Sequence, residues 1–540
     1  MIFNQKVGAL NRFPKTALFC LLFILSVILS GMQQAPSSPQ PGRRTTVNME
    51  YADSTSFDNY NNPDIHILRG NVRFRHDSTY LYCDSAYYYE KNNSLEAFSN
   101  VRIEQGDTLF IYGNYLIYEG NQSLARMREN VRMENRSNTL FTDNLDYDRN
   151  RNLGYFFDGG MLVDSVNELT SIYGQYSPAT KMALFKDEVT LTNPQFVLRS
   201  DTLQYDTADK VAIIVGPTVI ESDSGIIYSS RGWYYTEIDE GSLYDRSIVT
   251  SKDKTKTITA DTLFYNRNTG FGEAFGHMVL NDTVKKIILT GNYGYYDDLQ
   301  KFAFATDSAQ CIEYSRSDSL FLHADTLQML TIGEERELKA YYCVRIYRID
   351  LQGVCDSLQF NTIDSTLYLS KNPVLWNTGY QLTGDTIKIL FNDSTIERVN
   401  VIERAFVIEE VDTTYFNQTK GRNLTAFFIE GELYRIDIEG NTESIYYPVE
   451  EEGIEFLGRS KIESPNMTIY VEDRKPVEVK WWPAPSGTTL PIPDLNPEQK
   501  FLKDFVDFNY LRPQSREDIF TKTAMKEEDV PEPRKFRTKR

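Results

Sequence analysis

The stretch Gly70-Asn71-Val72-Arg73-Phe74 decides the fold, because its alternation of apolar and polar side chains returns about every 30 residues. It comes back as Ser99-Asn100-Val101-Arg102-Ile103 and Glu129-Asn130-Val131-Arg132-Met133, and more loosely as Gly159-Gly160-Met161-Leu162-Val163, Asp187-Glu188-Val189-Thr190-Leu191 and Gly276-His277-Met278-Val279-Leu280. In a β-strand, successive side chains point to opposite faces, so this alternation places one set in a core and the other in water. The stretch therefore predicts strands with one buried face.

A second phrase, a small residue or Thr followed by Asp or Asn, runs half a period out of step with the first. It reads Cys83-Asp84-Ser85, Gly113-Asn114-Tyr115, Thr142-Asp143-Asn144, Ser200-Asp201-Thr202-Leu203, Ala260-Asp261-Thr262-Leu263, Gly291-Asn292-Tyr293, Ala324-Asp325-Thr326-Leu327, Cys355-Asp356-Ser357-Leu358 and Gly384-Asp385-Thr386. Asp, Asn and Gly are turn residues, so each period is expected to hold two turns and two extended segments. A carboxylate that recurs in every period is a structural part of the repeat rather than a catalytic acid.

These patterns predict an all-β fold, an elongated array of repeats of about 30 residues with two strands in each rung. We expect a signal peptide or N-terminal anchor at residues 1–31, a polar linker at 32–60, the β-repeat domain at 61–400 and a looser continuation at 401–480. Residues 481–540 read as a Pro-rich linker and charged tail, expected to be disordered, with a docking element for a partner or a membrane surface as the alternative.

The N-terminus predicts export. Lys6, Arg12 and Lys15 precede an uncharged apolar run at 17–29, which has the organisation of a signal peptide and is short for a membrane span. Because Ile28 and Leu29 stand where a cleavage site would need a small residue, an uncleaved inner-membrane anchor remains the alternative.

The composition carries no sign of nucleic-acid binding, metal binding or catalysis. The net charge of −19 disfavours a nucleic acid as partner. Neither the histidines nor the cysteines beyond the signal have the spacing of a metal site, at His66, His76, His277, His323, Cys83, Cys311, Cys343 and Cys355. Cys83 and Cys355 fill a slot that small residues hold elsewhere, and a disulfide between Cys343 and Cys355 stays open. We expect a protein that is not an enzyme and uses no cofactor.

The signal, the two-strand repeat and the Asn-Val-Arg cadence resemble the OstA-like proteins, the group of lipopolysaccharide transport protein A and the N-terminal domain of its outer-membrane partner. The resemblance is clearest from Leu68 to Leu203 and continues more loosely to Asp385. It implies a V-shaped β-jellyroll whose two sheets hold an apolar groove for lipid A acyl chains. The chain is much longer than a typical periplasmic bridge protein of that family.

The resemblance implies a periplasmic lipid-binding bridge or scaffold that carries lipopolysaccharide toward the outer membrane. Its partners would be lipopolysaccharide, other lipopolysaccharide-transport proteins paired through edge strands, and further copies of itself joined end to end. The alternative locations are anchorage in the inner membrane and association with the outer membrane. The candidate residues that would line the groove alternate along their strands and so point to one face: Val72, Phe74, Val101, Ile103, Val131 and Met133. The alternative is that the same residues form a dry core between the sheets.

Two other classes of function remain open from the sequence. One is an exported β-solenoid that acts as an adhesin or structural spacer, and the other is a polysaccharide-acting enzyme on a parallel β-helix. An adhesin would carry many more rungs, and an enzyme would interrupt the repeat with an irregular loop bearing clustered acids.

Overall fold

The structure, a computed structural model, describes residues 45–58, 62–297, 299–333, 335–392, 395–448 and 456–529. The expected signal or anchor at 1–31 lies outside these ranges. Within them, the chain forms forty β-strands and six short 3₁₀ helices. The prediction of an all-β repeat fold is confirmed. No helix in the described ranges is both long enough and apolar enough to cross a membrane.

The chain divides into two compact units, the first of which takes the residues up to 106 together with 115–124. It contains β1 (Asn48–Tyr51), β2 (Ser54–Asp58), β3 (Asn62–His76), β4 (Thr79–Tyr89), η1 (Glu90–Asn92) and β5 (Ser94–Gln105), while β6 (Leu109–Glu119) is divided between the units. Strands β1 and β2 both pair with β3. The end of the stretch that composition assigned to a polar linker, 32–60, therefore already belongs to the β fold.

The second unit takes residues 107–114 and the chain from 125 onward. Its first strands are β7 (Leu124–Asn135), β8 (Asn138–Asp148), β9 (Leu153–Phe156), β10 (Gly160–Val163), β11 (Glu168–Ser171), β12 (Tyr173–Tyr176), β13 (Met182–Asn193), β14 (Phe196–Asp206), β15 (Val211–Ile214), β16 (Thr218–Ser222), β17 (Gly225–Ser229), β18 (Arg231–Tyr235) and β19 (Glu240–Ser251). The middle strands are β20 (Lys256–Asn266), β21 (Phe271–Asp282), β22 (Ile287–Asp297), β23 (Phe302–Thr306), β24 (Gln310–Glu313), β25 (Leu320–His323), β26 (Thr326–Ile332), β27 (Glu335–Arg348), β28 (Leu351–Asn361) and β29 (Thr366–Ser370).

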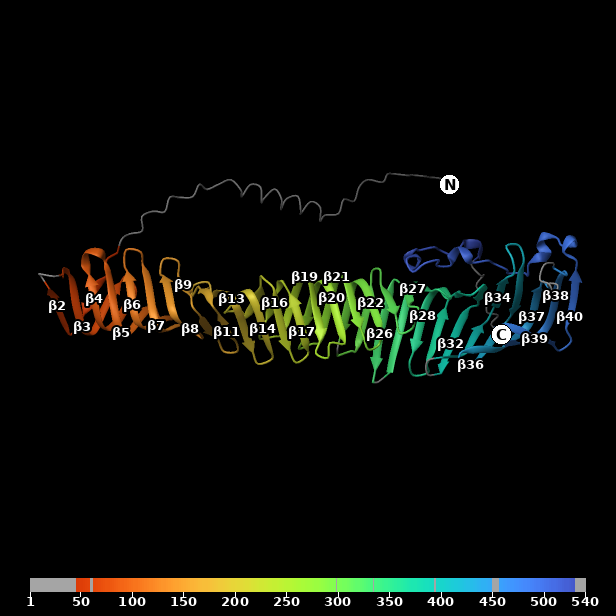
Figure 1. The fold of residues 1–540 in the computed structure, drawn as a ribbon, viewed down its shortest axis with the longest axis horizontal. Helices are drawn as coiled ribbons and strands as arrows, with labels where there is room; N and C mark the ends of the chain where they lie inside the picture. Colours follow the sequence, from red (N-terminus) through yellow and green to blue (C-terminus); the bar gives the residue numbers. More distant parts are fainter. Residues whose placement is uncertain are drawn as a thin grey trace, which may run out of the picture. The chain divides into compact units, whose positions relative to one another are not determined.

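The last strands of this unit are β30 (Val374–Asn377), β31 (Tyr380–Thr383), β32 (Thr386–Asn392), β33 (Thr395–Ile402), β34 (Ala405–Glu410), β35 (Phe416–Gly421), β36 (Asn423–Ile429), β37 (Glu432–Tyr446), β38 (Arg459–Glu472), β39 (Lys475–Trp482) and β40 (Ser486–Leu490). The short helices η2 (Ile492–Asp494), η3 (Pro497–Lys500), η4 (Asn509–Leu511), η5 (Asp518–Phe520) and η6 (Glu527–Asp529) follow. In Figure 1 the strands of this unit succeed one another in chain order. Strand β33 runs across the boundary expected at residue 400.

Each long strand bends near its middle, at a pair of residues that interrupts the antiparallel register. In the pairing of β3 with β4 the register jumps between Arg69 and Val72, and the intervening Gly70 and Asn71 both have positive φ, 78° and 48°. Gly and Asn favour this left-handed backbone, which explains why Asn recurs at this place as Asn71, Asn100 and Asn130. The Asn-Val-Arg phrase is therefore a bulge inside a strand, and not a turn between strands.

The Asp phrase lies against the same bend, which corrects the expectation that the two phrases mark separate turns. The side-chain amide of Asn100 donates to Asp84 Oδ2 at 2.7 Å. In the second unit, Lys371 Nζ bonds to Asp356 at 2.7 Å, and the His277 ring bonds to Asp261 at 2.7 Å. The recurrent Asp thus accepts a hydrogen bond from a residue at the next bend, which lies inside a strand for Asn100 and His277 and between β29 and β30 for Lys371. Chain reversals occur elsewhere, at the strand ends.

In the second unit the hydrogen-bonded sheet folds at the bend into two layers that face each other across the core, and we treat these layers as two sheets. In the second unit we call sheet A the sheet that holds β10, β11, β16, β17, β24, β25, β30, β31, β34, β35 and β40, and sheet B the one that holds β9, β12, β15, β18, β23, β26, β29, β32, β33, β36 and β39. Long strands such as β13, β14, β27 and β28 contribute one half to each sheet. The faces that the sheets turn toward each other are called inner faces below.

Candidate functional site

The six residues predicted to line a lipid groove lie on inner faces and are fully buried. Their exposed fractions are 0% for Val72, 1% for Phe74 and Val101, 2% for Ile103 and Val131, and 0% for Met133. At these positions the sheets pack closely enough to exclude solvent. A lipid could reach them once the two sheets had separated, and their role as lining residues stays a prediction.

Within the second unit, the inner faces of the two sheets are buried up to about β18, and we call this part the closed section. There a polar network joins the strand ends of sheets A and B that lie opposite the bend. Asn167, in the turn between β10 and β11 of sheet A, donates to Tyr205 Oη of sheet B and to Thr236 Oγ1, just after β18 of sheet B, both at 2.8 Å. Asn193 Nδ2 donates to Asn167 Oδ1 at 2.9 Å. Burial, together with the hydrogen bond that its hydroxyl donates to Asp164, raises the pKa of Tyr205. The network holds the two sheets together at the strand ends opposite the bend.

Apolar inner-face residues of the next strands are partly exposed. On sheet B, Tyr265, Tyr296 and Leu338 are 41%, 42% and 37% exposed, whereas Tyr205 on the equivalent face of the closed section is 0% exposed. On sheet A, a row of cross-strand neighbours is half-buried: Val249, Ile258, Leu280, Leu289, Cys311 and Leu322. We call these nine residues the open inner face.

Near the bend the same strands are closed and their side chains are small. Ala260, Ala274, Ala305 and Ala340 are between 0% and 2% exposed. The two sheets therefore meet at the bend and diverge toward the opposite ends of their strands. This part of the structure offers an apolar surface, repeated from strand to strand, that water reaches.

Residues 44–201 match the sequence profile of the OstA-like protein family. This part of the chain is OstA-like. The match agrees with the resemblance read from the Asn-Val-Arg cadence, which is clearest over 68–203. No curated protein matches the chain. The OstA-like segment ends within β14, so the open inner face lies beyond it.

Neither the OstA-like segment nor the rest of the described chain brings together three or more His, Cys, Asp or Glu side chains in a group that could hold a metal ion. Four cysteines are described, and all are free thiols: Cys83, Cys311, Cys343 and Cys355. The disulfide between Cys343 and Cys355 that the sequence left open is thus not formed here.

The thiols of the described residues should differ widely in reactivity. Burial raises the pKa of Cys83 and of Cys355 to about 12, while Cys343 is exposed at a bulge. Because the thiolate is the reactive form, its fraction at a given pH falls tenfold for each unit of pKa. Alkylation of the native protein at pH 8, mapped by mass spectrometry, should label Cys343 at least ~100-fold faster than Cys83 or Cys355. Equal labelling rates in the folded protein would contradict the closed packing of the two buried slots.

Proposed function

We propose that this protein is a non-catalytic, periplasmic lipid-binding bridge that carries lipopolysaccharide toward the outer membrane along its inner faces. The observation that carries the proposal is the open inner face, a continuous apolar row on strands that follow an OstA-like segment. The inner faces are proposed to hold the acyl chains of the lipid. Its sugar and phosphate groups would stay in water beside the strand ends opposite the bend.

The physical requirement for such transport is an apolar surface that does not end from one step to the next. Exposing acyl chains to water costs roughly 25 cal/mol per Å², so a lipid must stay covered throughout its movement. The row from Val249 to Leu322 passes directly between cross-strand neighbours on sheet A, as from Ile258 to Leu280 and on to Leu289. Similar side chains at each strand make neighbouring positions nearly equal in free energy, which favours movement over tight binding.

The end of the second unit suits an assembly through edge strands. Strands β39 and β40 each pair with β38, and no further strand among the described residues extends the sheets beyond them. An unpaired edge is a template for a strand of another chain. We propose that lipopolysaccharide-transport proteins, or further copies of this chain, pair there. Export by the N-terminal segment would place the chain in the periplasm, with an inner-membrane anchor or outer-membrane association as alternatives.

Site-specific photo-crosslinking in cells that make lipopolysaccharide tests this function. A crosslinking residue at Leu280 or Leu289 should capture lipopolysaccharide, because both side chains lie on the open inner face. The same residue at Thr290, which follows Leu289 and points to the other side of sheet A, is the matched control and should capture none. Equal capture at Leu289 and Thr290, or no capture at Leu280 and Leu289, would overturn the proposal. Capture at Phe74 and Ile103 would show in addition that the sheets separate where this structure has them closed.

A further inference from the structure

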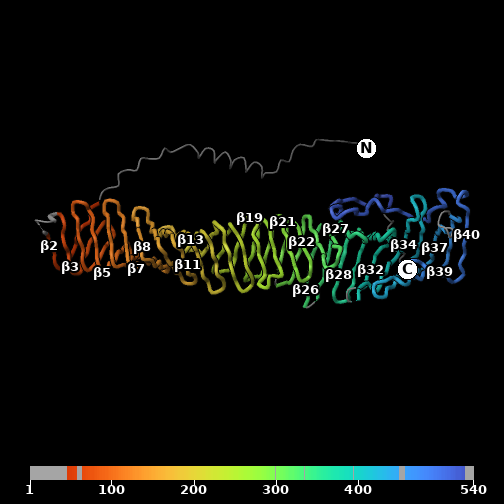
Figure 2. The backbone as a smooth tube through the Cα atoms, viewed as in Figure 1, coloured from red at the N-terminus to blue at the C-terminus, as the bar shows by residue number. Residues whose placement is uncertain are grey.

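The C-terminal segment 491–529, which we call the strap, runs back along the outer face of sheet A. Composition predicted a disordered linker here, but the described residues of the segment pack against the strands (Figure 2). Arg459 on β38 donates to the carbonyl oxygen of Gln499 at 2.9 and 2.6 Å. Arg345 on β27 donates to the carbonyl oxygens of Leu511 and Thr523 at 3.2 and 3.1 Å. The strap thus runs opposite to the order in which the strands are added.

Two buried glutamines hold the backbone of the strap as a neighbouring strand would. Gln418 donates to the Lys500 carbonyl at 2.9 Å and accepts from the Leu502 amide at 2.8 Å. Gln381 repeats the arrangement, since it donates to the Val506 carbonyl at 2.8 Å and accepts from the Phe508 amide at 2.9 Å. The glutamines are 1% and 5% exposed. Each amide therefore satisfies one donor and one acceptor of the strap, which fixes its register on the sheet.

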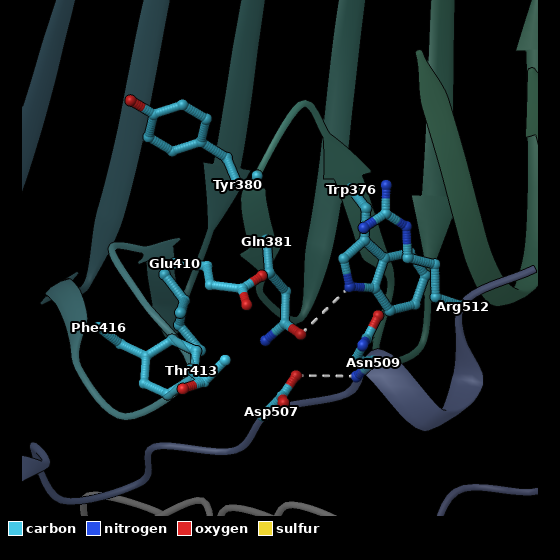
Figure 3. Close-up of a pocket in the computed structure, with 11 residues that line it drawn as sticks. Trp376, Tyr380, Gln381, Glu410, Thr413, Phe416, Asp507, Asn509 and Arg512 are labelled. Carbon is cyan, nitrogen blue, oxygen red and sulfur yellow. Dashed lines mark hydrogen bonds between the residues drawn. The ribbon is translucent and has the colours of Figure 1, made fainter. Parts of the chain in front are cut away.

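Apolar contacts join the strap to the same face. Leu502 packs in a cluster with Phe406, Ile408, Ile445 and Tyr447, and Phe508 and Leu511 pack in another with Val374 and Trp376. Figure 3 shows the intervening cavity, with Trp376 and Gln381 of sheet A facing Asp507 and Asn509 of the strap. In the cavity, Trp376 Nε1 donates to Gln381 Oε1 at 3.3 Å. These contacts give sheet A a second hydrophobic core on its outer side.

In an ordinary stack of two sheets the inner faces are buried and the outer faces are exposed. On this part of sheet A the outer face is the more deeply buried one. On the outer face, Trp376, Gln381 and Ile408 are neighbours across strands and are between 3% and 5% exposed. On the inner face of the same strands, Leu375, Leu382 and Val407 are also neighbours but are half-buried. The inner row is in line with the open inner face, because Leu322 pairs with Ile346, Ile346 with Gly353 and Gly353 with Leu375. The two linking residues, Ile346 and Gly353, are buried.

We propose that the strap is a splint that lets sheet A stand apart from sheet B. A sheet needs a packed layer on at least one face to be stable in water. In the closed section each sheet obtains that layer from the other sheet. At β30, β31 and β34, the strap supplies the layer for sheet A from outside, so that Leu375, Leu382 and Val407 can remain accessible on the inner face. That this accessible face serves as a path for lipid rests on the function proposed above.

Hydrogen exchange on the full-length protein without lipid tests the splint. The double variant Gln381→Ala/Gln418→Ala removes both amide clamps, and Gln359→Ala, a glutamine on sheet B that bonds to Glu337, is the matched control. We expect the strap and strands β30, β31, β34 and β35 to exchange at least tenfold faster in the double variant, with β13–β16 unchanged. The control should behave as the unmodified protein does.

A second variant keeps the test decisive if the strap stays bound after loss of the clamps. Leu502→Asp/Phe508→Asp places carboxylates in both strap clusters and should detach the strap. If the strap then exchanges freely while β30, β31, β34 and β35 keep full protection, sheet A does not depend on it and the splint is refuted. Because no lipid is present, this result is independent of the crosslinking experiment: failed lipid capture would overturn the transport function and leave the exchange result standing.

Discussion

Replacing Leu289 by aspartate should strongly reduce lipid capture at the open inner face without unfolding the protein. Leu289 is half-buried, so a carboxylate there keeps contact with water. Its cross-strand neighbour is Leu280, and a charge beside an acyl chain would have to be desolvated as the lipid passes. We expect capture by a crosslinker at Leu280 to fall roughly tenfold or more, equivalent to about 1.4 kcal/mol.

The matched controls for this substitution are Thr290→Asp and Leu198→Asp. Thr290 lies on the opposite side of the same strand, so its replacement should leave capture unchanged. Leu198 lies on the inner face of the closed section and is 0% exposed, so aspartate there should destabilise the fold by about 3–5 kcal/mol. Crosslinking measures capture in Thr290→Asp, and circular dichroism with thermal unfolding measures the stability of each variant. If Leu289→Asp unfolds the protein as Leu198→Asp does, the open inner face is a closed core and the assignment fails.

The repeat itself was predictable because its signals are local. Alternation within Val101-Arg102-Ile103 identifies the buried side of a strand, and Asn100 marks a position that needs a left-handed backbone. The structural role of the recurrent Asp also followed from repetition, since Asp84 accepts a hydrogen bond from Asn100. What repetition could not distinguish was a reverse turn from a bulge inside a strand, because Gly and Asn suit both.

The open inner face was missed because parity tells which side of a strand faces inward, and not how far apart the sheets lie. That separation depends on contacts between distant parts of the chain. A partial signal existed in the small inner residues Gly272, Gly294 and Ala303, which leave space where Tyr205 closes the earlier strands. The six predicted lining residues have the right parity but lie where the sheets are in contact.

The strap escaped detection for a related reason. Its prolines and lack of periodicity are typical of a linker, and its hydrogen-bond partners on the strands lie 40 or more residues away, with 40 for Arg459 and Gln499 and 84 for Gln418 and Leu502. A signal was nevertheless present on the strands that it covers. Trp376 and Ile408 stand at outer positions, so these strands are apolar on both sides, which indicates a second layer of packing.

Replacing Asn167 by alanine should open the closed section and extend the accessible inner face. Asn167 is 2% exposed and bonds to Tyr205, Thr236 and Asn193, so its loss leaves three buried polar groups short of a partner. Each such group costs about 1–3 kcal/mol, and the shared network makes a total of roughly 3 kcal/mol reasonable. The response that costs the least free energy is separation of the two sheets at the strand ends opposite the bend, which lets water reach these groups.

Two measurements check this expectation. The control is Asn266→Ala, because the Asn266 side chain bonds to Glu240 and to the Thr269 amide and lies outside the network. Hydrogen exchange in β11, β13 and β14 should accelerate in Asn167→Ala and remain unchanged in the control. A crosslinker at Leu169, which is 0% exposed, should begin to capture lipopolysaccharide in the Asn167→Ala background. Faster exchange without capture would mean that the opened section is no path for lipid, whereas neither change would show that packing alone, without the polar network, keeps the sheets together.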